Sequence, residues 1–127
     1  MTVTEWRHLS SLESALVEQL LAPDFSGKDE LIRQSADALA VTIDSDGSVR
    51  FRLGPSPPAS TIRSRVPTEG EFQDSDAVTV HVLLHVVDGY MHELEIYKED
   101  GSQVLDWSQA TCMKVFALGG DSGGWPR

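Results

Sequence analysis

Three Asp-Gly pairs, Asp46-Gly47, Asp88-Gly89 and Asp100-Gly101, each stand between runs in which apolar and polar residues alternate. Alternation with a period of two places apolar side chains on one face of a β-strand and polar side chains on the other. Asp-Gly is favoured at hairpin turns because glycine readily adopts a positive φ. The three pairs therefore predict a meander of antiparallel hairpins, and they constrain the fold more than any other feature.

A helical pattern precedes the first hairpin. Ser10 and Glu13 have the spacing of a capping box, and leucines recur at every fourth position up to Pro23. A shorter helical pattern over residues 28–33 follows Ser26, which we expect to cap it. Together with the strands, these patterns predict an α+β fold in which one or two amino-terminal helices pack on an antiparallel β-meander of about five or six strands.

The turns also predict how the strands pair. In the first hairpin, a three-residue loop would place Ile43 opposite Val49 and Val41 opposite Phe51, so that both apolar sets share one face. A third strand is expected over residues 62–72, and its proline and glycine favour an edge position or a bulge. The turn at 99–101 predicts a further returning strand, and a last strand is expected within 111–118.

In the central hairpin, a two-residue loop at Asp88-Gly89 would place carboxylates beside the apolar row, which is costly. We therefore expect a three-residue loop with Gly89 at positive φ. This loop gives four apolar-side pairs: Val86 with Tyr90, Leu84 with His92, Val82 with Leu94, and Val80 with Ile96. On the opposite face it pairs His81 with Glu95 and Leu83 with Glu93.

A chain of 127 residues is long enough to bury one core. We expect a single domain over residues 1–118 and a flexible, glycine-rich tail over 119–127. The only cysteine, Cys112, cannot form an internal disulfide, and the amino terminus lacks the segments of a signal peptide, so we expect a cytoplasmic location. We read Cys112 as a buried, inert thiol. No apolar run approaches the roughly 20 residues that a bilayer requires.

The charge of the chain limits its partners. Twenty acidic residues against ten basic ones give a net charge of −10. Such a charge repels phosphate backbones and anionic lipid, so we expect neither nucleic acid nor a membrane as a partner. It attracts cationic surfaces, which makes a basic protein the expected partner.

Two strings resemble functional motifs without meeting their requirements. Residues 120–124 match the string around the nucleophile of trypsin-like serine proteases, but only three residues follow, too few for the wall of a substrate pocket. Residues 44–47 lack the glycine and glutamate that a calcium loop needs at set positions, so we predict an ordinary turn. Trp125 has no predictable partner within the domain and is a candidate contact to another molecule.

The polar face of the central hairpin is the candidate site. It gathers His81, His85, Glu93 and Glu95, and the strand continues into Tyr97, Glu99 and Asp100. We assign these seven residues to partner binding and expect the two glutamates on this strand to hold histidine charge to higher pH. The alternative is a divalent metal site on the histidines and glutamates, because these are ordinary ligands. Without a short-spaced ligand motif we expect neither a metal nor a cofactor.

Residues 83–90 (LLHVVDGY) and 93–101 (ELEIYKEDG) resemble a signature shared by small uncharacterised bacterial proteins of the actinobacterial type. The resemblance implies a small α+β domain of unknown activity and carries no catalytic residue with it. In size, charge and architecture the chain also resembles, more loosely, the immunity proteins of polymorphic toxin systems, which bind a toxin domain and cover its active site. This second resemblance implies a basic toxin or nuclease domain as the partner.

Two function classes follow. The first is an acidic protein-binding module, for example an immunity-type inhibitor, that uses the polar face of the central hairpin. The second is a small metal-binding or metal-assisted hydrolytic domain centred on His81 and His85. A domain with a small-molecule ligand between sheet and helix is a third option. Because no complete catalytic set is present, the sequence favours the binding module.

Overall fold

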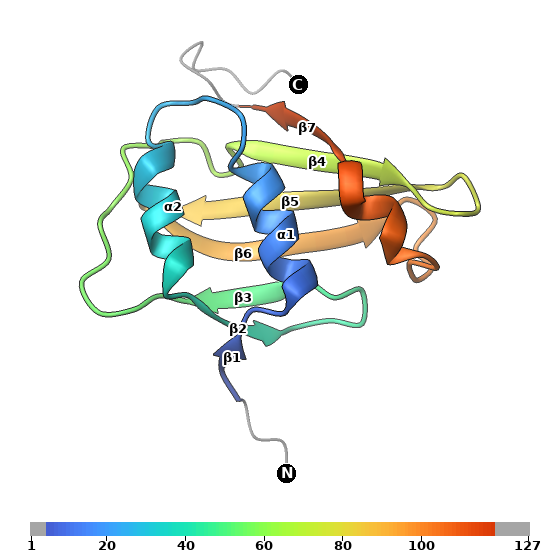
Figure 1. Cartoon of the computed structure of the whole chain (residues 1–127), viewed down its shortest axis with the longest axis horizontal. Coiled ribbons are helices and arrows are strands. Elements are labelled where there is room, and N and C mark those ends of the chain that lie inside the picture. Colours follow the sequence, from blue (N-terminus) through green and yellow to red (C-terminus); the bar gives the residue numbers. More distant parts are fainter. Residues whose placement is uncertain (1–4, 119–127) are drawn as a thin grey trace.

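A seven-stranded antiparallel sheet carries two helices on one face in the computed structural model, which describes residues 5–118 (Figure 1). The strands are β1 (Arg7–His8), β2 (Leu39–Thr42), β3 (Val49–Arg52), β4 (Thr68–Gln73), β5 (Thr79–Val87), β6 (Tyr90–Lys98) and β7 (Lys114–Ala117). The helices are α1 (Ser11–Leu20), α2 (Lys28–Ala36) and the 3-10 helix η1 (Trp107–Cys112). The α+β class is confirmed, with slightly more strands than expected.

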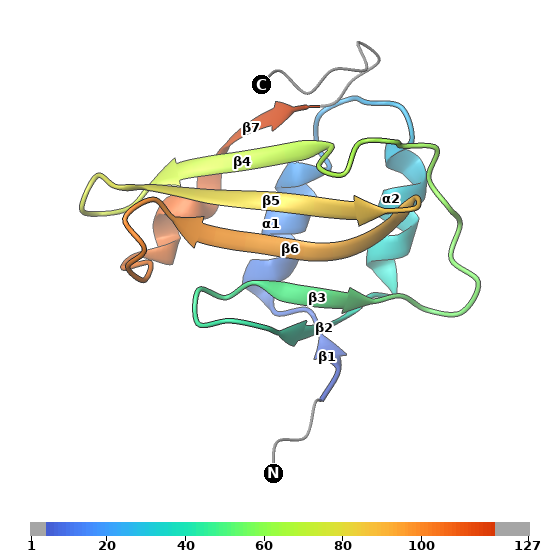
Figure 2. The same ribbon diagram turned by 180° about the vertical axis from the view of Figure 1, so that it is seen from behind.

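The strand order in the sheet is β1-β2-β3-β6-β5-β4-β7. The order departs from a simple meander because β3 pairs with β6, which leaves the β4–β5 hairpin on the far side. The connection from β3 to β4 therefore runs around one end of the sheet, as Figure 2 shows from behind. The glycine-rich tail, with Trp125 and the string at 120–124, lies outside the described residues.

Helix α1 begins as predicted. The Ser10 hydroxyl accepts a hydrogen bond from the Glu13 amide at 3.1 Å, and the Glu13 carboxylate accepts one from the Ser10 amide at 2.9 Å, which completes the capping box. Leu16 and Leu20 are buried against the sheet. In the described part of the chain, no helix combines the length and the apolar character needed to cross a membrane.

The cap predicted for α2 is wrong. Gly27, not Ser26, is its N-cap residue, and no side chain caps the helix. Gly27 has a φ of 90°, and its carbonyl accepts a hydrogen bond from the Ser60 hydroxyl at 2.6 Å. A glycine is required there because a Cβ would lie 2.4 Å from the Ser60 hydroxyl oxygen.

The central hairpin keeps the predicted face of β5 but not the predicted register, and on β6 Met91 enters the core in place of Tyr90 and His92. Its loop has two residues, Asp88 (φ 54°) and Gly89 (φ 87°), the sign pattern of a type I′ turn. Four pairs show the change: Val86 with Met91, His85 with Glu93, Leu84 with Leu94, and Val82 with Ile96. A β-bulge leaves His92 unpaired and returns the apolar residues to one face. The predicted three-residue loop is therefore wrong. A two-residue loop seemed excluded because it would place glutamates beside the apolar row, and the bulge prevents this by pairing Leu84 with Leu94 instead.

The first hairpin has a four-residue loop, not the predicted three. The Asp44 carboxylate accepts hydrogen bonds from the amides of Asp46 and Ser48, each at 3.0 Å, and the Ile43 amide donates to the Ser48 carbonyl at 2.9 Å. The pairing therefore shifts by one residue and turns Ala40, rather than its neighbours, into the core. Ile43 is consequently 41% exposed. The prediction that residues 44–47 form a turn is confirmed.

Two further strand predictions need correction. The third strand begins at Thr68 rather than near residue 62, and β7 pairs with it, so it is not an edge strand. Its Gly70 packs under Met113, whose flexible side-chain end would have to shift to admit a Cβ at 2.9 Å. The turn at 99–101 does not lead into a strand that returns along β6; the chain instead enters η1, where Trp107 packs on Phe72 at a ring-centroid distance of 5.7 Å. The last predicted strand corresponds to β7.

Gly89 offers a test of the hairpin turn. A Cβ at Gly89 would lie 2.5 Å from the Ser60 carbonyl oxygen, whereas a Cβ at Gly101 (φ 78°) would meet no atom within 4 Å. We expect Gly101→Ala to lower the free energy of unfolding by about 1–2 kcal/mol, the cost of a left-handed alanine. Gly89→Ala should cost clearly more, because it adds a clash with backbone. Urea unfolding measures both, and equal losses would contradict the close approach of the turn to Ser60.

Candidate functional site

The face of the sheet turned away from α1 and α2 is called the open face, and no helix of residues 5–118 lies over it (Figure 2). It is formed by alternate residues of β3 to β7: Arg50, Glu69, Glu71, His81, Leu83, His85, Glu93, Glu95, Tyr97, Lys114 and Phe116. Five of the seven candidate residues therefore lie on it. Glu99 reaches it from the turn after β6, whereas the Asp100 carboxylate binds the amide and hydroxyl of Ser102 within that turn.

His81 lies between two carboxylates. Its Nδ1 is 2.8 Å from Glu69 and its Nε2 is 2.7 Å from Glu99, and its ring stacks on Tyr97 at 4.9 Å between centroids. The predicted pairing of His81 with Glu95 is wrong, because the bulge places Tyr97 opposite it. Burial alone would lower the pKa of His81, but the hydrogen bonds to Glu99 and Glu69 outweigh burial and raise it.

His85 has two different partners. Its Nε2 is 2.7 Å from Glu95, and its Nδ1 accepts a hydrogen bond from Nε of Arg65 at 3.2 Å. Because Arg65 can only donate, the proton of the neutral ring is on Nε2, directed at Glu95. Sequence reasoning missed Arg65, since it lies in an irregular segment that no periodicity marks.

The third charged contact involves Glu93. Its carboxylate lies 3.5 Å from the Arg50 guanidinium, at the long end of an ion pair, and its backbone faces both Arg50 and His85. The bulge residue His92 lies beside it. Burial, followed by the positive charges of Arg50 and Arg65, lowers the pKa of His92, which favours the neutral ring.

These contacts change the chemical reading of the face. Glu69, Glu93, Glu95 and Glu99 each contact a histidine or an arginine, so each of these carboxylates has a partner on the face itself. Both ring nitrogens of His81 and of His85 are already engaged. Among residues 5–118 no group of three or more His, Cys, Asp or Glu side chains is arranged to hold a metal ion. The arrangement suits surface recognition better than coordination.

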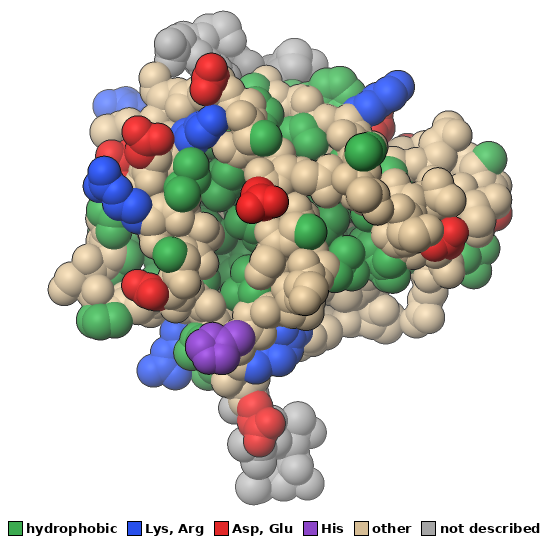
Figure 3. All heavy atoms as spheres, viewed as in Figure 1, with side chains coloured by type: hydrophobic (Ala, Val, Ile, Leu, Met, Phe, Trp, Pro, Cys, Tyr) green, Lys and Arg blue, Asp and Glu red, His purple; other side chains and the backbone are tan. Residues whose placement is uncertain are grey.

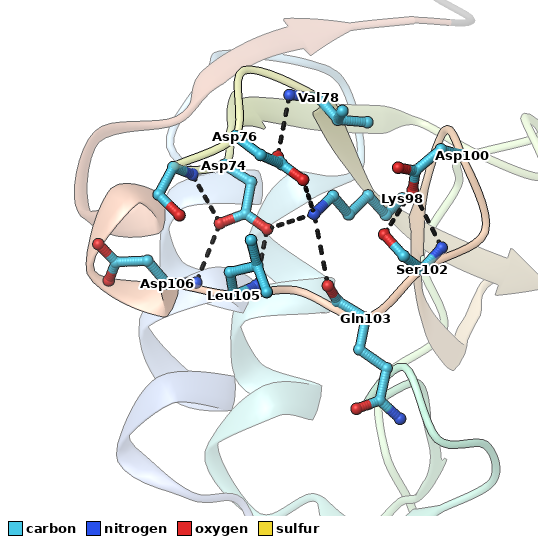
Figure 4. Close-up of polar contacts among 10 residues, drawn as sticks. Asp74, Asp76, Val78, Lys98, Asp100, Ser102, Gln103, Leu105 and Asp106 are labelled. Carbon is cyan, nitrogen blue, oxygen red and sulfur yellow. Dashed lines mark hydrogen bonds and ion pairs between the residues drawn. The ribbon is translucent and has the colours of Figure 1, made fainter.

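A buried ionic cluster lies at the end of the sheet, where the β4–β5 turn meets the chain that follows β6 (Figure 4). The Lys98 ammonium is 2.8 Å from Asp74 and 2.7 Å from Asp76, and the side chains of Lys98 and Asp74 are fully buried. Asp74 also accepts hydrogen bonds from the amides of Ser75, Leu105 and Asp106. The cluster thus ties the β4–β5 turn to the chain that leaves β6.

Sequence reasoning missed this cluster. Residues 74–76 read as a turn, and a lysine near a strand end reads as solvated, yet Lys98 continues the buried row of Leu94 and Ile96. Side chains alternate along a strand, so residues 94, 96 and 98 share one face, and this alternation could have predicted that Lys98 is buried. Burial alone would raise the pKa of Asp74, but the Lys98 ammonium and the three amides hold it well below its usual range. Burial alone would lower the pKa of Lys98, and its two aspartates raise it instead.

A groove lies on the opposite side of the molecule, between α1 and α2. It has a volume of about 510 Å³ and is lined by Leu9, Ser14, Val17, Glu18, Leu21, Ala22, Lys28, Ile32 and Ser35. Figure 3 shows hydrophobic side chains reaching the surface on this side. The groove contains none of the seven candidate residues. Cys112, which we expected to be buried, is exposed at the end of η1.

Histidine titration tests the His81 contacts. Glu69→Gln and Glu99→Gln should each lower the pKa of His81, because each removes a carboxylate that stabilises the imidazolium. Glu93→Gln is the matched control, since Glu93 has no contact with His81. A histidine pKa raised by folding stabilises the protein fully below about 6.5, the value of the free side chain, and this contribution disappears as pH rises through the folded pKa. NMR titration measures the shift; an unchanged pKa in both glutamate variants would contradict the assignment.

Asp74→Asn tests the buried cluster. The folded pKa of Asp74 is depressed, so its contribution to stability is fully present above about 3.8, its ordinary pKa, and is lost as pH falls below that value. We expect the variant to be less stable than the wild-type protein at pH 7, and the difference to shrink between pH 4 and pH 3. Urea unfolding across this range measures it. Asp100→Asn, which alters an exposed turn carboxylate, is the control and should cost less at pH 7.

Comparison with known proteins gives one match. A family model for a domain of unknown function, DUF6984, matches residues 6–108. No curated protein and no solved structure matches the chain. The matched segment contains strands β1 to β6, both α-helices and all seven candidate residues. The chain therefore belongs to the DUF6984 family.

Proposed function

We propose that this protein is an acidic protein-binding module and that the open face is its binding surface. The observation that carries the proposal is a sheet face over which no helix of residues 5–118 lies and on which aromatic side chains stand among polar side chains that already contact one another. Exposed aromatic residues within a polar rim are typical of protein interfaces.

The aromatic residues supply the contact area. Tyr97 is 40% exposed near the end of β6, and Phe116 is 43% exposed on β7. Leu83 lies in the same row as Phe116, with Glu69 between them, and Tyr97 lies in the neighbouring row opposite His81. Such side chains contribute affinity when a partner removes them from water.

The charged residues supply orientation. His81, His85, Glu93, Glu95 and Glu99 are held by hydrogen bonds or ion pairs within the domain, so a partner would not have to order them. Preorganised side chains lower the entropic cost of association. Asp100, beside Glu99, belongs to the rim of this surface.

The proposed partner is a basic protein. The net charge of −10 would speed its capture, because charge complementarity acts mainly on the association rate. In its most specific form the module is an immunity-type inhibitor that covers a basic toxin or nuclease domain in the cytoplasm. This form rests on size, charge and architecture. No observation favours the alternative of a metal site on His81, His85, Glu93 and Glu95.

The test begins with copurification from the native host and identification of a basic partner. With the purified pair, Tyr97→Ala and Phe116→Ala should each weaken binding about tenfold. Ile32→Ala is the matched control, because Ile32 is 43% exposed on the helix side and equally apolar. Titration calorimetry measures the affinities. Binding that depends on Ile32 and not on Tyr97 or Phe116 would assign the interface to the other side of the molecule.

A further inference from the structure

One part of the open face gathers two arginines and two histidines around Glu93, although the chain as a whole is strongly acidic. Four side chains form this basic cluster: Arg50 from β3, Arg65 from the segment before β4, His85 from β5 and His92 from the bulge in β6. They come from four separate places in the sequence. Their spacing in the sequence does not predict that these four side chains lie close together in the structure.

The backbone fixes the arrangement of the cluster. Arg50, Glu93 and His85 stand directly opposite one another on three adjacent strands, a row of about 10 Å at the usual strand spacing. Beyond His85, the Arg65 carbonyl accepts a hydrogen bond from the Val86 amide at 2.7 Å, which holds Arg65 against β5. The two guanidinium groups therefore approach the row from its two ends.

Arg65 is the least satisfied member. In the described part of the chain it forms no ion pair with a carboxylate, and its side-chain hydrogen bond goes to a histidine nitrogen. Arg50 has its one ion pair at 3.5 Å and is 44% exposed. Guanidinium groups bind the oxygens of phosphate and carboxylate in a fork, and most of the donors of these two arginines are available for such binding.

The bulge adds His92 to the same place. A bulge places an extra side chain at a position that regular pairing would not provide, and bulges are frequent next to functional sites. The side chain of His92 has no hydrogen-bond partner among the described residues. The positive charges of Arg50 and Arg65 act on it, so a proton on His92 would be favoured once an anion compensates them.

We propose that Arg50, Arg65 and His92 of this cluster bind the phosphate group of a small molecule, while His85, whose two ring nitrogens are engaged by Arg65 and Glu95, holds Arg65 in place. A single tetrahedral phosphate can accept hydrogen bonds from two guanidinium groups and an imidazole at once. A small ligand fits better than a nucleic acid, because the charge of −10 opposes the approach of a polyanion. The site goes beyond protein binding and does not depend on it.

Glu93 makes the proposal specific. Its carboxylate occupies the middle of the row and competes with a phosphate for Arg50. Removal of this charge should therefore strengthen phosphate binding, whereas removal of either arginine should weaken it. A nonspecific charge effect would not depend on position in this way.

The experiment titrates inorganic phosphate and phenyl phosphate into the full chain while NMR follows the four histidines. Sodium chloride at equal ionic strength is the reference, because salt screens surface charge. Both phosphates should shift His92 selectively and raise its pKa; tighter binding of phenyl phosphate would identify an ester as the ligand, and equal binding would identify free phosphate. Arg50→Gln and Arg65→Gln should weaken binding about tenfold or more, and Glu93→Gln should strengthen it.

Arg33→Gln is the matched control. It removes the same charge from the helix side of the molecule and should leave phosphate binding unchanged, and thermal unfolding checks that each variant is folded. If phosphate shifts the NMR signal of His92 no more than sodium chloride does, the proposal is overturned. An Arg65→Gln variant that binds phosphate as well as Arg33→Gln would also overturn it.

Discussion

The bulge at His92 is the constraint on which the rest of the sheet depends. The Asp88-Gly89 turn alone would align Leu84 with a glutamate, but one unpaired residue in β6 restores the match of Leu84 with Leu94 and of Val82 with Ile96. Since side chains alternate along a strand, this one residue decides which groups enter the core and which reach the open face. The core under α1 and α2 and the contacts of His81 and His85 all follow from it.

The sequence carried enough information for the class and the faces. The capping box at Ser10, the positive φ of Gly89 and the burial of Leu94 and Ile96 were all predictable from local patterns, because each depends on near neighbours or on parity. The registers of two hairpins were not. In the first, the Asp44 carboxylate caps two amides and extends the loop, and in the second the bulge adds a residue. Side-chain capping and bulges leave little trace in an apolar pattern.

The sequence predicted where the candidate site lies but not which residues its side chains contact. His81, His85, Glu93, Glu95 and Tyr97 lie on the expected face, yet the groups that give them their chemistry come from elsewhere. Glu69 belongs to a strand whose start was misplaced, and Arg65 belongs to an irregular segment in which its carbonyl accepts a backbone hydrogen bond from Val86. Such contacts depend on strand order, and the pairing of β3 with β6 could not be derived from adjacent turns.

That strand order has a consequence for the speed of folding. Pairing β3 with β6 joins Val49 to Leu94, so the intervening chain, including β4 and β5, must be organised before this contact becomes favourable. The hairpin of β5 and β6 joins residues close in sequence and is the natural nucleus, and the Ser60 amide then attaches the long connection to the Gly89 carbonyl at 2.9 Å. A sheet closed by distant pairs favours slow folding, and until β3 arrives the edge of β6 is open to pairing with another chain.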